Sequence, residues 1–299
     1  MKLNTIEILN DWNHQMRINF DMIKIMCRNG LENRIEFWSC LTGAKNYSTQ
    51  NENLYEQLNI DNLKKSTVYQ IDLDASRQFS KHDSFNTSEN IEKLSKILKA
   101  YSTIRPNPGY CQAQAPIAAY LMKILPSEVL IFWVFFSINE NYMERYFQEG
   151  FIRFKIDCRI LQNLIQEYLP NISNLLNRFS ITPDMFCTDW FMCLFVRNIP
   201  ETTLLRVFDM FFCEGMKVIF RISLAILELC LSEMKVTNLT EDEEKILLTL
   251  RNLPKSIFEE EKLLKCSSKY EKITSEKLRS MFLKECFDSN FEDWKKVLL

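Results

Sequence analysis

An aspartate and an arginine stand three residues apart in the stretch QIDLDASRQF, as Asp74 and Arg77. At this spacing the carboxylate and the guanidinium can pair whether the segment is a helix or a turn. One interpretation is an ordinary surface ion pair, which contributes little to stability. The other is an arginine that is held out for chemistry on a partner molecule. Spacing alone leaves both interpretations open.

A glutamine follows a Pro-Gly turn in the stretch NPGYCQAQ, residues 107–114. Pro108 and Gly109 predict the turn, and Tyr110 and Gln112 follow where a helix begins. An amide held on rigid backbone presents both a donor and an acceptor, so it can orient a water molecule. The other interpretation of Gln112 is helix capping or a local hydrogen bond.

The sequence gives little support for a cysteine nucleophile, a carboxylate acid–base pair, a nucleotide-binding loop or a metal site. Cys111 could be a thiolate nucleophile near a helix N-terminus, but that mechanism needs a base, and nothing places His82 beside it. The carboxylates of residues 241–244 lie on a solvated run with no apolar surroundings. The chain has no GxxxxGK[ST] or GxGxxG loop. Its two histidines and ten singly placed cysteines predict no metal site.

The composition is that of a soluble helical protein. The 299 residues are 46% apolar and 25% charged, with a net charge of -2, which does not suggest a nucleic-acid partner. Five glycines are few for a protein rich in tight turns or phosphate loops. Cysteines in apolar runs indicate reduced core residues of an intracellular protein. The apolar run 129–138 is too short to span a bilayer and predicts a buried helix.

Apolar residues recur at three- and four-residue spacing along most of the chain, which predicts an all-α fold without significant sheet. We expect one helix over 89–101 to stop at the prolines of 105–109. We also expect a helix over 182–196, with Thr182 as its N-cap, and one over 201–215 that ends at Gly215. Further helices are predicted from near residue 112 to 126 and over 127–136, 154–169, 216–234 and 244–253. Loops are predicted over 45–65, 80–90 and 235–244. The tail from 271 is charged and amphipathic, with apolar positions Leu278, Met281, Phe282, Phe287, Phe291 and Trp294.

Several blocks together resemble the TBC-domain proteins, which are GTPase-activating proteins for Rab GTPases. The stretch RNGLENRIEFWSCLTG resembles the family's first block, IxxDxxR matches Ile71, Asp74 and Arg77, and YxQ matches Tyr110 and Gln112. The stretches DWFMCLF and LLRVFDMFFCEGMKVIFR resemble the downstream blocks. The other matched positions are Arg28, Gly30, Arg34, Trp38, Leu41, Gly43, Trp190, Phe191, Phe195, Arg206, Asp209, Phe212, Gly215 and Phe220.

The chain departs from the family's pattern at a few positions. Leu31 and Glu32 stand where the family usually has a proline after a Gly-Ile pair, which should affect a turn. The third block is commonly QGM, whereas Ala113 and Gln114 make it QAQ here, a form found in a subset of the family that keeps the first glutamine. Phe208 stands where tryptophan is usual.

The resemblance implies a TBC domain of two helical subdomains. Its expected limits are 20–270, with subdomains of about 20–125 and 126–270. Residues 1–19 form an N-terminal extension and 271–299 the amphipathic tail. These limits follow the extent of the matching blocks.

The resemblance also implies a mechanism that acts in trans. Arg77 is the expected arginine finger and Gln112 the expected glutamine finger, with Asp74, Tyr110 and Ile71 supporting them. Arg34, Trp38, Trp190, Arg206 and Asp209 are expected either to support the fold or to touch the GTPase. The implied partner is a GTP-loaded Rab, which carries the GTP and Mg2+, so no cofactor of its own is expected. We expect a cytoplasmic protein that inserts into no membrane and reaches endomembranes through the Rab. The alternative is a catalytically silent Rab-binding scaffold or effector.

Overall fold

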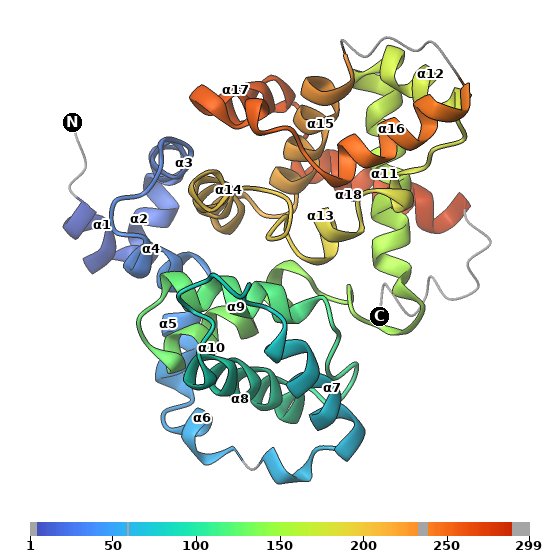
Figure 1. Ribbon diagram of the computed structural model, residues 1–299. Coiled ribbons are helices and arrows are strands. Elements are labelled where there is room, and N and C mark those ends of the chain that lie inside the picture. Colours follow the sequence, from blue (N-terminus) through green and yellow to red (C-terminus); the bar gives the residue numbers. More distant parts are fainter. Residues whose placement is uncertain (1–4, 59, 233–238, 289–299) are drawn as a thin grey trace. The chain divides into compact units, whose positions relative to one another are not determined.

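The computed structural model describes residues 5–58, 60–232 and 239–288 (Figure 1). Every regular element in these ranges is a helix, which confirms the all-α prediction. The chain divides into two compact units, unit 1 (Met1–Gln148) and unit 2 (Glu149–Leu299). None of the described helices is long and apolar enough to cross a membrane.

Unit 1 holds the segment with Arg77 and Gln112. Its α-helices are α1 (Thr5–Asn10), α2 (Trp12–Ile18), α3 (Phe20–Asn29), α4 (Arg34–Leu41), α5 (Ala44–Gln50), α6 (Leu54–Gln57), α7 (Lys65–Ser76), α8 (Ser88–Ile104), α9 (Gln114–Ile124) and α10 (Glu128–Ser137). A 3-10 turn, η1 (Ile60–Asn62), precedes α7, and a π-helix, η2 (Ile138–Tyr142), continues α10.

Helix α8 forms where the periodicity predicts it. The Thr87 side chain caps its first turn by accepting from the Asn90 backbone N–H at 3.2 Å. Its buried stripe includes Leu94, Ile97 and Leu98, and it packs against α7, α9 and α10. The helix ends at Ile104, before the prolines, as expected.

Helix α10 is the core of unit 1. It packs against α4, α5, α8 and α9, which explains why it is apolar on nearly every side. Trp133 stacks on Tyr47 with 6.1 Å between the ring centroids, and Phe135 meets Tyr101 edge-on at 5.3 Å. Because α10 belongs to unit 1, the units divide after Gln148, about 20 residues later than the subdomain limit expected near 125.

The N-terminal segment also belongs to unit 1. Ile8 is fully buried, α1 packs against α4, and Trp12 meets Phe37 edge-on at 6.0 Å. Residues 5–18, expected to be an extension, therefore add helices to the body of unit 1.

Unit 2 is built around α15. Its α-helices are α11 (Ile152–Tyr168), α12 (Pro170–Arg178), α13 (Thr188–Met192), α14 (Glu201–Glu214), α15 (Lys217–Leu231), α16 (Leu239–Arg251), α17 (Lys262–Ser267) and α18 (Ser275–Asp288), with 3-10 turns η3 (Glu149–Phe151), η4 (Pro183–Met185), η5 (Lys255–Ile257), η6 (Glu259–Glu261) and η7 (Ser268–Tyr270). Helix α15 packs against α11, α12, α13, α14, α16 and α17, so nearly all of its sides are buried. Helix α14 ends at Gly215, as predicted.

Two local expectations before residue 200 are wrong. The stretch 45–65, expected to be a loop, contains α5, α6 and η1, because α5 packs on α10 and Tyr55 is buried against Phe132 at 4.7 Å. The stretch 182–196, expected to be one helix, is divided into η4 and α13. Leu194 and Phe195 then have positive φ angles of 49° and 62°, which a continuing helix does not allow.

The C-terminal tail packs on unit 2 as far as it is described. Helix α18 lies against α11, where Phe282 is buried below the Arg153 guanidinium at 4.3 Å. Asn163 donates to the Glu285 carboxylate at 2.7 Å. Phe291 and Trp294 lie outside the described residues, as do residues 235–238 of the break expected over 235–244. The rest of that break is wrong, because α16 begins at Leu239.

Candidate functional site

The arginine of the IxxDxxR block stands at the C-terminal end of α7. Ile71, Asp74 and Ala75 form the buried face of this helix. Arg77 follows the last helical residue, and 49% of its side chain is exposed. Its guanidinium pairs with the Asp74 carboxylate. The ion pair suggested by the spacing is therefore present, but its acidic partner is fully buried.

The Asp74 carboxylate joins two parts of unit 1 that are distant in sequence. One oxygen, Oδ1, binds Arg77. The other, Oδ2, accepts hydrogen bonds from Gln70 Nε2 at 3.0 Å and from the Tyr110 hydroxyl at 2.8 Å. Gln78 Nε2 donates to the Asp74 backbone carbonyl at 2.7 Å. A buried carboxylate is stable when several donors surround it, as they do here. We call these residues the Asp74 hub.

Gln70 and Gln78 are members of the hub that sequence reasoning missed. Gln70 stands four residues before Asp74 within α7, a spacing that places two side chains on one face of a helix, and Gln78 stands four residues after Asp74, just beyond the end of α7. That spacing is a signal the sequence contains.

Tyr110 links the hub to the turn that carries Gln112. Burial, together with its hydrogen bond to the Asp74 carboxylate, raises the pKa of Tyr110 well above its ordinary value. Tyr110 therefore remains a hydrogen-bond donor at neutral and moderately alkaline pH. The hydrogen bond ties the start of this turn to the end of α7.

The turn itself depends on Gly109. Its φ angle is +79°, a region that disfavours other residues, and an added Cβ would lie 3.2 Å from the Pro106 carbonyl oxygen. Gln112 follows three residues later and is exposed. The side chains of Arg77 and Gln112 are thus both open to solvent, and the chain segments that carry them meet at Asp74.

Cys111 does not have the character of a nucleophile. Its side chain is partly buried, and burial raises the pKa of the thiol. His82, the base such a mechanism would need, is exposed. Among the described residues no three His, Cys, Asp or Glu side chains gather in a way that could hold a metal ion.

The remaining motif residues fall into two groups. Trp38, Trp190 and Asp209 are fully buried, which favours a role in the fold over contact with a partner. Trp190 packs against two phenylalanine rings at 5.2 and 5.7 Å. Arg206 pairs with Glu261 inside unit 2, and Arg34, the first residue of α4, is half-buried.

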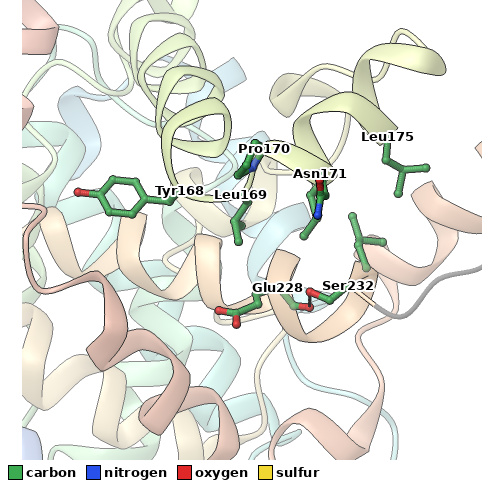
Figure 2. Close-up of a pocket in the computed structure, with 9 residues that line it drawn as sticks. Tyr168, Leu169, Pro170, Asn171, Leu175, Glu228 and Ser232 are labelled. Atoms are coloured by element: carbon green, nitrogen blue, oxygen red, sulfur yellow. Dashed lines mark hydrogen bonds between the residues drawn. The ribbon is translucent and has the colours of Figure 1, made fainter.

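Unit 2 contains a hollow of about 390 Å³ between α12 and α15, shown in Figure 2. Its acidic residue is Glu228, which accepts from Lys269 at 2.6 Å and from Tyr270 at 2.5 Å. Burial disfavours the charge, but these donors lower the pKa of Glu228. The carboxylate thus serves internal contacts, and the residues of the IxxDxxR and YxQ blocks lie in unit 1.

The sequence matches the model of the Rab-GTPase-TBC domain over residues 32–235. This chain belongs to that family. TBC1 domain family member whacked of Drosophila melanogaster is 35% identical over 258 residues, which make up 85% of this chain and 71% of the relative. TBC1 domain family member 10B of Mus musculus is 34% identical over 267 residues, 88% of this chain. This TBC domain spans about a third of that relative, 33% of its length.

Solved structures share the fold of this TBC domain. The crystal structure of the Chlamydomonas flagellar RabGAP TBC domain superposes with a TM-score of 0.74 at 23% identity, covering 87% of this chain and 90% of that one. The Ypt/Rab-GAP domain of Gyp1p gives a TM-score of 0.69 at 16% identity and covers 94% of this chain and 100% of that one. The TBC fold expected from the sequence blocks is confirmed.

Proposed function

We propose that this TBC domain accelerates GTP hydrolysis by a Rab-family GTPase, with Arg77 and Gln112 entering the partner's nucleotide site. The observation that carries the proposal is the Asp74 hub. One buried carboxylate binds both Arg77 and Tyr110, and so holds the arginine near the turn that presents Gln112. Family membership supplies the class of partner.

Arg77 suits the charge that develops during hydrolysis. Negative charge spreads over phosphate oxygens in the transition state, and an arginine supplied in trans raises the rate by about 10³–10⁵. That factor corresponds to about 4–7 kcal/mol of barrier. The guanidinium has five N–H donors in a rigid fork, so it can bind phosphate oxygens in two places at once.

The hub also allows Arg77 to turn toward a partner. When the guanidinium moves away, Asp74 keeps the Gln70 amide and the Tyr110 hydroxyl as donors, so the buried carboxylate retains partners. The guanidinium is half exposed, so water screens part of its attraction to the buried carboxylate. Its reorientation is therefore inexpensive compared with the stabilisation it gains at the phosphate.

Gln112 has the complementary task of positioning the attacking water. Its amide can accept from the water and donate to a phosphate oxygen. The GTP and Mg2+ are the partner's, and this chain supplies no cofactor. Because the partner is lipid-anchored, we place the reaction on the cytoplasmic face of an endomembrane.

An exposed face of α7 extends this site. Tyr69 and Leu73 are 70% and 43% exposed, and they precede Arg77 by two turns and one turn of the same helix. Ser66 and Ser76 border this face, and Asp72, which pairs with Lys99 at 2.7 Å, lies along its edge. If Arg77 reaches the nucleotide, this apolar face contacts the GTPase surface around it.

Tyr69→Ala and Leu73→Ala are expected to raise the GTPase concentration for half-maximal stimulation about 5- to 30-fold, with a smaller change in the maximal rate. The exposed side chains contribute docking area but touch no reacting atom. Leu248→Ala, which removes a 48% exposed leucine from α16, is the matched control. A fall in maximal rate at unchanged half-saturation would contradict the docking role.

The test of the proposed function is phosphate release from a panel of GTP-loaded Rab GTPases, with and without the full chain. Stimulation of at least one member by a factor of 10³ or more is expected. Binding to a GTP-loaded Rab without stimulation would instead identify a silent scaffold, and the proposal would then be wrong.

A further inference from the structure

Gln114 is a fully buried amide beside the glutamine turn, at the first position of α9. Its Oε1 accepts from the Cys111 backbone N–H at 2.9 Å, and its Nε2 donates to Asn139 Oδ1 at 2.8 Å. Asn139 is 4% exposed and donates to the Phe135 carbonyl at 2.7 Å. Both ends of the Gln114 amide are therefore used, at a position where the commoner family residue, methionine, could make neither bond.

The bond to Cys111 serves a backbone group that needs a partner. A partly buried N–H group in a turn needs an acceptor, because no regular element supplies one. Cys111 lies three residues before α9 begins, and the Gln114 side chain reaches back to its N–H much as the glutamine of a capping box reaches back to the N-cap residue. The Gln114 N–H in turn donates to the Cys111 carbonyl at 2.9 Å. Cys111, the residue before Gln112, is thus held through both its N–H and its carbonyl group.

Glu140, the residue after Asn139, holds the opposite end of the loop 105–113. Arg105, the residue that follows α8, donates from Nε to Glu140 at 2.8 Å. The Tyr101 hydroxyl lies 3.3 Å from the same carboxylate. Residues 139 and 140 therefore bind the two flanks of the loop 105–113.

Asn139 and Glu140 lie in the π-helix η2 (Ile138–Tyr142), where the Met143 N–H reaches back to the Ile138 carbonyl at 2.9 Å. A π-turn changes the direction of successive side chains relative to a regular helix, and such turns are frequent at functional sites. Here it directs two consecutive polar residues to the two ends of one loop.

We propose that η2 and Gln114 form a clamp that positions Gln112 for the hydrolysis step. This inference rests on the function proposed above. Gln114 and Asn139 are positioning residues, since they act through the backbone at Cys111. Tyr110, held by Asp74, anchors the other side of Gln112. In the QAQ form of this block, Gln114 therefore holds Gln112 in place through the backbone at Cys111.

Gln114→Met tests the clamp directly, because methionine has a similar volume and offers neither hydrogen bond. We expect the maximal stimulated rate to fall about 10- to 100-fold, because a displaced catalytic group loses rate steeply. The half-saturating GTPase concentration should change by less than about threefold. Exchange of the Cys111 amide proton, measured by NMR without any GTPase, should become about 10-fold faster.

Two variants of Asn139 separate positioning from simple stability. Asn139→Asp keeps an acceptor for Gln114 Nε2, whereas Asn139→Leu has none, and both lose the bond to the Phe135 carbonyl. We expect the maximal rate to fall with leucine and to stay within about threefold of the parent with aspartate. If Asn139 had only a structural role, the maximal rate of each variant would fall in proportion to its loss of thermal stability.

Arg105→Ala removes the ion pair with Glu140 that holds the start of the loop 105–113. The Arg105 side chain is 41% exposed, so we expect the variant to fold. The maximal rate should fall several-fold. Ser223→Ala is the control, since this buried hydroxyl bonds to the Ile219 carbonyl within α15; the rate should not change.

Two results would overturn the clamp. One is an unchanged Cys111 exchange rate in Gln114→Met, which means that the amide does not hold the loop. The other is faster exchange with a parental maximal rate, which means that Gln112 does not need the clamp. A parent chain that stimulates no Rab would refute the proposed function instead, and the exchange measurement would still decide whether Gln114 holds the loop.

Discussion

Arg77→Lys is expected to reduce the stimulated GTPase rate by about 10³-fold or more, close to the effect of Arg77→Ala. Lysine keeps the positive charge and can still pair with Asp74. Its ammonium group lacks the planar guanidinium geometry that binds two phosphate oxygens at once. The lysine side chain also differs in length, so its charge lies at a different position. The measurement is single-turnover phosphate release from the Rab identified in the panel, at saturating concentrations of the variant.

The fold should tolerate this substitution. The Arg77 side chain is 49% exposed, and lysine keeps a positive charge beside the buried Asp74 carboxylate, so the folded state keeps this pairing. Arg197→Lys is a matched control, because Arg197 is 40% exposed and pairs with Asp189 at 3.5 Å. A lysine variant at position 77 that stimulates as well as the parent would show that Arg77 is not the finger.

Gln112→Ala is expected to lower the maximal stimulated rate by about 10²-fold while leaving the affinity for the GTP-bound partner within about threefold. The amide orients the attacking water and is otherwise exposed, so its loss affects the transition state more than the bound complex. Affinity is measured by calorimetry with a GTPase loaded with a non-hydrolysable GTP analogue.

The matched control is Gln57→Ala, which removes another exposed glutamine from unit 1. It should leave the rate and the affinity unchanged. If Gln112→Ala weakens binding as much as it lowers the rate, Gln112 is a docking residue, and the water must be positioned by the GTPase itself.

Helices with a one-sided apolar stripe were predictable from the sequence. The stripe from Leu94 to Tyr101 and the prolines after Ile104 define α8 without reference to any other segment. Gly215 likewise marks the end of α14. Local spacing and chain breakers decide these features, because they act within one or two helical turns.

The errors arose where packing with distant segments overrides local composition. The polar stretch 45–65 is helical because α5 lies on α10, and a propensity scale cannot include that contact. The stretch 182–196 does not form one helix: α13 within it packs on α15, and positive φ angles follow at Leu194 and Phe195. Periodicity is weak where every side of a segment is buried.

The sequence by itself determined the chemistry available to this protein: an arginine three residues after an aspartate, a glutamine after a Pro-Gly turn, and the TBC blocks around them. Only the tertiary structure decided that Asp74 holds both Arg77 and Tyr110, and that Gln114 binds Asn139 beside the Gln112 turn. The physical reason is that these hydrogen bonds join side chains from different helices and loops. Such bonds leave no periodic pattern in the chain, and they form only when packing of the apolar faces brings their donors and acceptors together.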